Sequence, residues 1–255
     1  MPAAASASAA ATAAAAATAA SPRFARLGGK LVCVAKNYAA HALEMGGSAA
    51  RPAAPSIFLK PHSSVIRGGD GRAVVRPRAV RELHHEVELG VVVGRAVPRG
   101  SLRAADWRGA VGGYVLALDM TARDHQAAAK AAGAPWTLGK CWDSFAPLSA
   151  RVLAPSAVRD PHALELSLSV DGAERQRAST AGMLFRVPEL LAHAASVMSL
   201  ERGDVLLTGT PEGVGPVRGG NVMRAALRDL SGGGAGVLLD EMEFRVEDEA
   251  EEAAA

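Results

Sequence analysis

The chain is poor in lysine. Its 255 residues include only five lysines although Lys and Arg together number 28, so arginine is the default cation. Arginine stays charged in almost any setting, whereas lysine carries a compact ammonium group whose pKa shifts readily. We therefore expect each retained lysine to mark a position where that chemistry is needed. The five are Lys30, Lys36, Lys60, Lys130 and Lys140.

Cysteine is scarcer still. Cys33 and Cys141 lie far apart in the chain and form no C-x-x-C unit. We interpret both as reduced intracellular thiols that pack in the core like small apolar side chains.

Dense hydrophobic runs and one-sided charge are also missing. The longest apolar stretch is the alanine-rich N-terminus, which Ser and Thr interrupt, so the sequence predicts no transmembrane helix. A formal net charge of +2, with acids and bases scattered, gives no concentrated basic surface for nucleic acid. At 49% hydrophobic residues, the chain can bury a substantial core in one domain.

The first 28 residues differ in kind from the rest. They are nearly all Ala, Ser and Thr, contain no acidic residue, and gain Arg23 and Arg26 only near their end. That composition matches an organellar transit peptide, and we expect a mitochondrial location, with plastid or cytosol as alternatives. A disordered low-complexity leader is the other interpretation. Residues 29–247 would then form one catalytic domain, followed by a disordered acidic tail over residues 248–255.

The body of the chain is dominated by strand patterns. Short apolar or alternating runs bounded by Gly, Pro or Asp predict strands at 31–34, 56–59, 87–93, 114–118, 164–170 and 205–207. Asp171-Gly172 predicts a hairpin turn. Helices are expected at 38–45, 122–132 and 187–198, and a glycine-rich loop at 231–236. The sequence thus predicts a mostly antiparallel β core with helices at its rim.

The run His84-His85-Glu86-Val87-Glu88 carries the first chemical signal. Side chains two apart on a strand share a face, so Glu86 and Glu88 project together, and Asp119 closes a later apolar stretch. Carboxylates so close repel unless a cation lies between them, and an all-oxygen site suits Mg²⁺, Mn²⁺ or Ca²⁺ better than zinc. The alternative is the solvated face of an antiparallel strand. His84 and His85 are ambiguous, since one of two adjacent strand residues must point away.

A second constellation lies on the short helix at 38–45. Asn37 is expected to cap this helix and Gly46 to end it. His41 and Glu44 are then at i and i+3, so the carboxylate can orient the imidazole as a general base. An incidental surface pair is the alternative.

Two further segments hold polar groups among apolar neighbours. Lys140 follows Trp136-Thr137-Leu138-Gly139, where a lysine either reaches solvent or fixes an anionic substrate. In the segment 203–216, Thr208, Thr210 and exposed backbone amides could hold a carboxylate or an oxyanion. Its glycine spacing fits neither a phosphate loop nor a dinucleotide fingerprint, and turn geometry alone would explain the glycines.

Taken in order, these motifs resemble the fumarylacetoacetate hydrolase family, in particular its small acylpyruvate hydrolases and oxaloacetate decarboxylases. The resemblance spans roughly 31–217. It rests on Lys-Asn-Tyr-x-x-His-x-x-Glu, Phe-Leu-Lys-Pro, His-His-Glu-x-Glu-Leu, Asp-Met-Thr-Ala-Arg-Asp, Trp-Thr-Leu-Gly-Lys and Leu-Thr-Gly-Thr-Pro. The resemblance departs most after residue 220, where an arginine-bearing segment and a glycine loop leave the order of 221–240 open, with a last strand expected at 241–246.

The resemblance implies an α+β, mostly β fold, a mixed β-sandwich roll with short peripheral helices, usually assembled as a homodimer. It also implies a Mg²⁺ or Mn²⁺ site and a small 2-oxo acid as substrate. Lys36 stands where relatives commonly have arginine, so a bidentate contact to a carboxylate would become a single one. By motif, the implied metal ligands are Glu86, Glu88 and Asp119; the implied catalytic residues are His41, Glu44 and Lys140; and the implied substrate-binding residues are Lys36, Tyr38, Lys60, Arg123, Gln126 and Thr210.

The expected chemistry is cleavage or decarboxylation of a 2-oxo acid. For an acylpyruvate, His41 assisted by Glu44 would activate water for attack on the distal carbonyl, releasing pyruvate and a carboxylic acid. For oxaloacetate, CO₂ would leave without water attack. Lys140 would neutralise the enolate or orient the substrate. A keto-enol isomerase of a 2-oxo acid is the alternative activity, and a catalytically inactive binding protein is a further alternative that the intact motifs disfavour.

Overall fold

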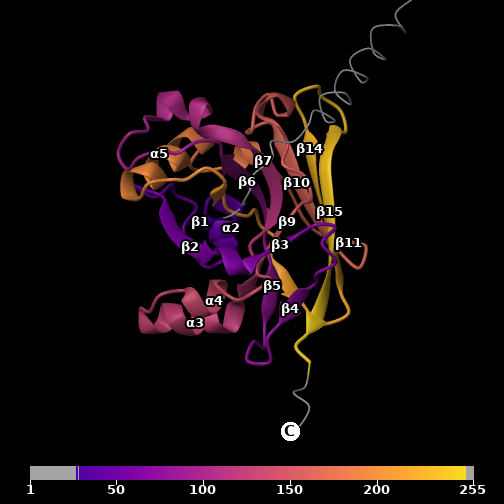
Figure 1. The fold of residues 1–255 in the computed structure, drawn as a ribbon. Coiled ribbons are helices and arrows are strands. Elements are labelled where there is room, and N and C mark those ends of the chain that lie inside the picture. The colour runs from indigo at the N-terminus through magenta and orange to yellow at the C-terminus, as the bar shows by residue number, and fades with distance from the viewer. Residues whose placement is uncertain (1–26, 28, 251–255) are drawn as a thin grey trace, which may run out of the picture.

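The computed structural model describes Leu27 and residues 29–250, and it shows a mostly β fold with a few short helices (Figure 1). This confirms the predicted fold class. The predicted leader over residues 1–28 lies, apart from Leu27, outside the described residues. In the described part of the chain, no helix is long and apolar enough to cross a membrane.

The largest sheet has seven strands in the order β2-β1-β12-β6-β7-β9-β3. Strand β6 is buried along its whole length, and its alternate side chains enter two different apolar clusters. Val87, Leu89 and Val91 pack in the larger cluster, while Val92 packs in the smaller one. Each such side chain contributes about 1.5–3 kcal/mol when it leaves water. The strands are β1 Lys30–Ala35, β2 Ser56–Pro61, β3 Val65–Arg67, β6 Val87–Val93, β7 Val111–Leu118, β9 Ala146–Leu148 and β12 Val205–Leu207.

A five-stranded sheet, ordered β11-β10-β14-β15-β4, stands on the right in Figure 1. In β10 every second residue is buried, because Leu164, Leu166 and Leu168 face the core while the serines between them face outward. The predicted hairpin at Asp171-Gly172 joins β10 to β11, and both turn residues have positive φ. The strands are β4 Val74–Arg76, β10 Leu164–Val170, β11 Ala173–Ser179, β14 Val222–Asp229 and β15 Val237–Asp248.

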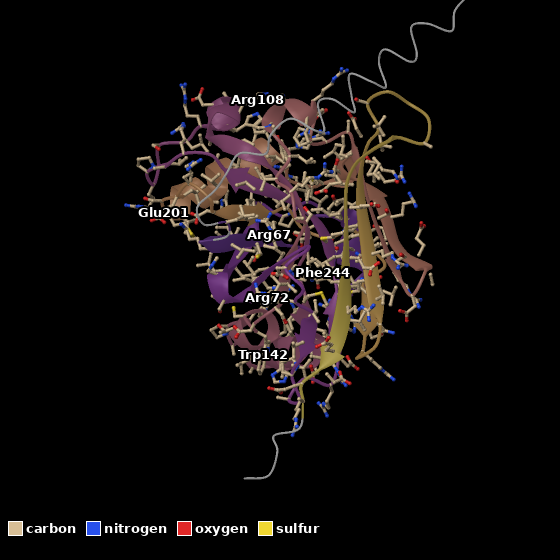
Figure 2. All side chains as sticks on the ribbon, turned by 45° about the vertical axis from the view of Figure 1, so that its right-hand side comes forward. Arg67, Arg72, Arg108, Trp142, Glu201 and Phe244 are labelled. Atoms are coloured by element: carbon tan, nitrogen blue, oxygen red, sulfur yellow. The ribbon has the colours of Figure 1, made fainter. Side chains whose placement is uncertain are left out.

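A three-stranded sheet has the order β13-β5-β8, and β5 ends immediately before Glu86. Its strands are β5 Leu83–His85, β8 Thr121–Ala122 and β13 Gly215–Val217. The short helices stand at the rim: α3 and α4 lie below β1 and β2 in Figure 1, and α5 lies above them. The α-helices are α2 Ala39–Glu44, α3 Arg123–Ala132, α4 Thr137–Lys140 and α5 Val187–Val197. The 3₁₀ turns are η1 His62–Ser64, η2 Ala104–Ala110, η3 Pro155–Ala157 and η4 Thr180–Gly182. Figure 2 places Arg108 of η2 near the top of the molecule and Trp142, just after α4, near the bottom.

The predicted strands and helices are all present, each within a few residues of its expected ends. The C-terminal part is more regular than expected. Residues 222–229 form β14, which pairs antiparallel with β15, and the glycine-rich loop joins them. Strand β15 is twelve residues long and continues to Asp248, and the Glu249 amide donates to the Arg76 carbonyl. Ordered chain therefore extends beyond residue 247, where we expected the tail to begin; residues 251–255 lie outside the described part.

The predicted role of Asn37 as a helix cap is wrong. The N-cap position of α2 is Tyr38, with no side-chain capping bond. The Asn37 side chain instead joins two other segments: its Nδ2 donates to the carbonyls of Phe185 (2.9 Å) and Thr208 (2.8 Å), and its Oδ1 accepts from the Phe185 amide (2.7 Å). Gly46 follows the helix with a φ of +68°, as its predicted role as the end of α2 requires.

Replacing Asn37 with Ala should therefore lower the free energy of unfolding by about 3 kcal/mol, since it leaves buried backbone groups without partners. Urea denaturation would measure the loss. Asn221→Ala, which removes bonds near the surface, should cost less than about 1 kcal/mol. Equal losses in the two variants would contradict this account of Asn37.

Candidate metal centre and its surroundings

Three carboxylates meet where β6 begins and β7 ends. Strand pairing sets Val87 opposite Leu118, so Glu86, just before β6, comes level with Asp119, just after β7. The Asp119 amide donates to the Glu86 carbonyl at 2.8 Å, which locks this register. Glu88 lies on the same face as Glu86, as the two-residue strand period predicts. Oxygen atoms of Glu86, Glu88 and Asp119 lie within 4.8 Å of one another, and all three side chains are buried.

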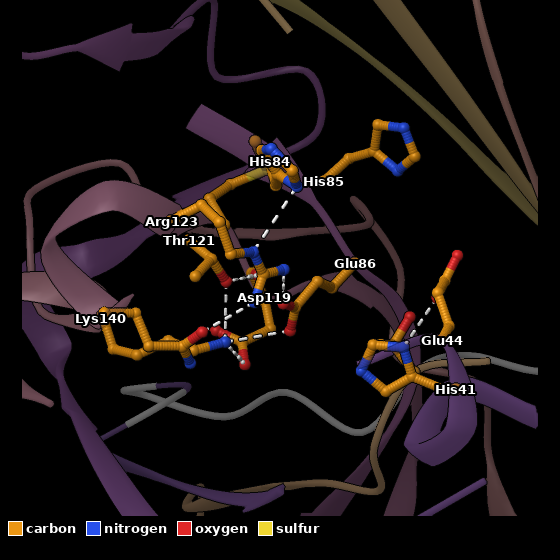
Figure 3. A network of polar contacts seen from close by, with 12 residues as sticks. His41, Glu44, His84, His85, Glu86, Asp119, Thr121, Arg123 and Lys140 are labelled. Carbon is orange, nitrogen blue, oxygen red and sulfur yellow. Dashed lines mark hydrogen bonds and ion pairs between the residues drawn. The ribbon is translucent and has the colours of Figure 1, made fainter. Parts of the chain in front are cut away.

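Cationic side chains compensate two of these carboxylates. Lys140 Nζ donates to Glu86 Oε2 (2.9 Å), Asp119 Oδ2 (2.6 Å) and Thr121 Oγ1 (2.7 Å), which uses all its hydrogens (Figure 3). Arg123 donates to Glu86 Oε1 at 2.5 Å. Lys60 forms an ion pair with Asp119 and donates to the carbonyls of Met120 and Phe145.

Glu88 is the exception. Its Oε2 accepts from the Gly209 amide at 2.6 Å, but it forms no ion pair with any residue that the structure describes. Burial, then repulsion from Asp119 and Glu86, raises the pKa of Glu88 well above its usual value. Burial also acts to raise the pKa of Glu86, but the charges of Lys140 and Arg123 more than offset it and hold that pKa low. Three cations thus face the three carboxylates, but all of them pair with Glu86 or Asp119, and Glu88 is left without a cationic partner.

The donor set fits a divalent cation. All available ligands are carboxylate oxygens, which Mg²⁺ and Mn²⁺ accept and which zinc uses less readily than nitrogen or sulfur. Asp119 Oδ1 is buried and paired with the Lys60 ammonium group. The buried Glu88 carboxylate has no such partner, and an oxygen-ligated cation would supply one.

A histidine and a carboxylate on α2 face this group. His41 Nδ1 lies 3.0 Å from Glu44 Oε2, and Glu44 Oε1 accepts from the Gly213 amide at 3.0 Å. In Figure 3, Lys140 approaches Glu86 from one side while His41 and Glu44 lie on the other. Since Nδ1 is engaged by Glu44 and His41 lines the cavity, Nε2 is the nitrogen available for proton transfer.

The adjacent histidines are not ligands. His85 Nδ1 contacts Gln176 Oε1 at 3.0 Å, and its ring turns away from the carboxylates in Figure 3. His84 Nδ1 accepts from Arg123 Nε at 3.4 Å. Burial and the charge of Arg123 lower the pKa of His84 to about 4, so the ring is neutral near pH 7 and can accept this bond. Both histidines support the residues around the carboxylates.

A cavity lies over the carboxylates, with about 370 Å³ of empty space that includes open solvent. Most of the predicted site residues line it, among them the three carboxylates, His41, Lys140, Lys36, Arg123, Gln126 and Thr210. Two predicted substrate contacts do not. Lys60 lies buried behind Asp119, and Tyr38 is buried at the start of α2 with a hydroxyl group that has no hydrogen-bond partner. The positions of Lys60 and Tyr38 favour support of the site over contact with substrate.

The glycine-rich turn after β12 holds the protein's own carboxylates. Its amides at Gly209 and Gly213 donate to Glu88 and Glu44, so the expected binding of a substrate oxyanion by these amides is not what the structure favours. Gly209 has a φ of +93°, and a Cβ there would lie 2.7 Å from Asn37 Cβ. Thr208 and Thr210 donate to the carbonyls of Leu89 and Val87, which fixes the turn against β6.

Lys130 and Trp136 also line the cavity, and the sequence assigned neither of them to the site, apart from the general expectation for the retained lysines. A signal was available for Lys130. Arg123, Gln126 and Lys130 are spaced i, i+3 and i+7 on α3, so they share one helical face.

The β fold and this buried all-oxygen centre define a class of protein, one built to hold a hard divalent cation at the ends of sheet strands. The model for the family Fumarylacetoacetate (FAA) hydrolase C-terminal matches residues 30–243. The chain belongs to this family, as its motifs predicted.

Individual relatives agree. The chain is 50% identical over 212 residues to the mitochondrial oxaloacetate tautomerase FAHD1 of Arabidopsis thaliana, covering 82% of this chain and 91% of the relative. It is 44% identical over 209 residues to the mitochondrial oxaloacetate decarboxylase of Dictyostelium discoideum, covering 82% and 93%. Among solved structures, fumarylpyruvate hydrolase from Pseudomonas aeruginosa in complex with Mn²⁺ and pyruvate matches with a TM-score of 0.76 and 34% identity, covering 86% and 90%.

The variant Glu88→Gln should show separately what the buried charge costs in stability and what it contributes to metal binding. Without metal it should unfold at the same temperature as the unchanged chain or higher, since repulsion with Asp119 and Glu86 is removed. Saturating Mn²⁺ at 100 times its dissociation constant should stabilise the unchanged chain by about 2.7 kcal/mol and the variant far less.

Thermal unfolding with and without Mn²⁺ would measure both effects. Glu243→Gln, at an exposed surface ion pair with Arg224, is the matched control and should keep the full response to Mn²⁺. An equal response to Mn²⁺ in Glu88→Gln would exclude Glu88 as a ligand.

Proposed function

We propose that this protein is a divalent-metal-dependent enzyme that interconverts the keto and enol forms of oxaloacetate. The observation that carries the proposal is the wall of one cavity, which bears a buried three-carboxylate group on one side and a carboxylate-oriented histidine on the other. Such a cavity pairs a site for a 2-oxo acid with a base placed to move its proton. The identity to oxaloacetate tautomerases supports oxaloacetate as the substrate.

Glu86, Glu88 and Asp119 would hold Mg²⁺ or Mn²⁺. When bound, the ion supplies a Lewis acid that stabilises charge on the keto oxygen by several kcal/mol. Lys140 would keep Glu86 and Asp119 in place, since its three hydrogens already go to these carboxylates and Thr121.

His41 would act on the methylene carbon of oxaloacetate, which lies between the keto group and the distal carboxylate. Its Nε2 takes a proton from this carbon, and a proton is added at the keto oxygen, so substrate and product are isomers. Glu44 holds the ring through Nδ1 and stabilises the imidazolium that forms. The Gly213 amide fixes Glu44 in turn, so the base is positioned by a chain of hydrogen bonds from the glycine-rich turn.

Hydrolysis of an acylpyruvate is the second candidate function, and the same dyad supports it. A base that takes a proton from carbon can also take one from water, which would then attack the distal carbonyl of an acylpyruvate. A relative in the solved structures is named fumarylpyruvate hydrolase. Another relative is named oxaloacetate decarboxylase. Decarboxylation of oxaloacetate needs a metal ion to stabilise the developing negative charge, but it needs no base. An inactive binding protein would not need the complete dyad, lysine and carboxylate set that this chain retains.

We further propose a mitochondrial location, because related tautomerases and a related decarboxylase carry that designation. We also propose a homodimer, as the family resemblance implies.

His41→Ala should lower the kcat of tautomerisation by about 10²- to 10⁴-fold, the usual contribution of general-base assistance. Ultraviolet absorbance of the oxaloacetate enol, followed in Mg²⁺ or Mn²⁺ before and after chelation, would measure it. Leu43 lies on the same helix and is 57% exposed, so Leu43→Ala should keep near-normal activity. Unaltered turnover in His41→Ala, or turnover that survives chelation, would sink the proposal.

The three activities should respond differently to the loss of this base. His41→Ala should lower tautomerisation and the cleavage of short acylpyruvates by about 10²- to 10⁴-fold, because both need a proton transfer, and should spare the slower release of CO₂ from oxaloacetate. Product assays for pyruvate and CO₂ would separate them. Equal loss of all three activities would instead indicate that α2 acts only as a cover over the site.

A further inference from the structure

The five lysines fall into two groups. Lys30, Lys60 and Lys140 each form an ion pair with a buried aspartate or glutamate. In the described part of the chain, Lys36 and Lys130 form no ion pair. Both of these unpaired cations line the cavity over the carboxylates. The two lysines without an ion-pair partner thus line the same cavity.

Two different elements hold these ammonium groups at the cavity. Lys36 follows β1 with a φ of +54°, an uncommon conformation for a residue with a side chain, and the hydrogen bonds of Asn37 hold the next residue in place. Its Nζ lies beside Gly47, where an added Cβ would come within 3.1 Å.

Lys130 lies in the last turn of α3, whereas Lys36 follows β1. Its Nζ is 5.2 Å from the centre of the Trp136 ring, and Trp136 packs on Phe58 with ring centres 5.5 Å apart. A cation over an aromatic face is held in position without being neutralised. Burial, then the charges of Arg123 and Lys36, lowers the pKa of Lys130, which is consistent with positive charges facing one another there.

Arg123 was predicted to bind substrate together with Lys36 and Lys60, but each of its three nitrogens already donates to a protein group. Nε donates to His84, one terminal nitrogen donates to Gln126 and the other to Glu86. Three of its five N–H groups are thus held by the protein, so its guanidinium group is fixed toward Glu86, Gln126 and His84. Lys36 and Lys130 offer free donors instead.

We propose that Lys36 and Lys130 together bind the distal carboxylate of a dicarboxylic 2-oxo acid and so select it over monocarboxylic analogues. The inference rests on the proposed function and narrows its substrate class. The buried carboxylate group and the two lysines line the same cavity, so one dicarboxylic ligand can contact both. A carboxylate between two ammonium groups relieves their mutual repulsion, whereas a methyl group in the same place would leave it in force.

The test compares ligands that differ only at the distal end. Lys130→Gln should raise the KM for oxaloacetate about 5- to 10-fold, as expected for a charged contact at a partly exposed site, with kcat within twofold. Lys36→Gln should act in the same way, and Lys130→Arg should recover most of the loss.

A binding measurement on the Mg²⁺-loaded protein keeps the inference separate from the reaction. Tryptophan fluorescence would give dissociation constants for malate and for 2-hydroxybutyrate, which carries a methyl group in place of the distal carboxylate; neither ligand can enolise. Lys130→Gln should weaken malate about 5- to 10-fold and leave 2-hydroxybutyrate within twofold. Arg108→Gln removes another cation stacked on a tryptophan, 4.6 Å from the Trp107 ring and at the far end of the molecule, and should change neither ligand (Figure 2).

Equal weakening of both ligands, or of neither, would overturn the assignment of Lys130. A protein that fails to turn over oxaloacetate yet still loses malate preference on Lys130→Gln would overturn the proposed function and leave the two-lysine site standing.

Discussion

The pairing of β6 with β7 is the constraint on which the rest of this protein depends. Antiparallel register brings Glu86 level with Asp119, and the strand period adds Glu88 to the same face. Three carboxylates in a dry interior are costly to hold together, because each loses its hydration and repels the others. The surrounding structure is arranged to reduce that cost.

The compensation is incomplete in a way that suits function. Lys140 bridges Glu86 and Asp119, and Lys60 faces Asp119 from behind, but Glu88 receives only a backbone amide from Gly209. The three cations balance the three carboxylates in number, but none of them pairs with Glu88. A divalent ion would supply the positive partner that Glu88 lacks, and the fold bears the cost of that buried carboxylate in its metal-free state.

The glycine-rich turn after β12 links this centre to the base. The Gly209 and Gly213 amides of the turn hold Glu88 and Glu44, so one piece of backbone positions both a candidate metal ligand and the residue that orients His41. Positive φ at Gly209 and its close approach to Asn37 explain why the turn needs glycine. A change in this turn would therefore be felt on both sides of the cavity.

The sequence by itself determined the elements and much of the chemistry. The two-residue period places Glu86 and Glu88 on one face, the i, i+3 spacing joins His41 to Glu44, and short-range preferences fix the strands, because these relations depend only on neighbouring residues. The ordered motifs then pointed to the family. Only the tertiary structure decided what lies between segments far apart in the chain: that Lys60 supports Asp119 from behind, and that Lys36 and Lys130 meet unpaired at one cavity. Those outcomes depend on which side chains from distant elements come within a few ångströms, and no local period encodes that distance.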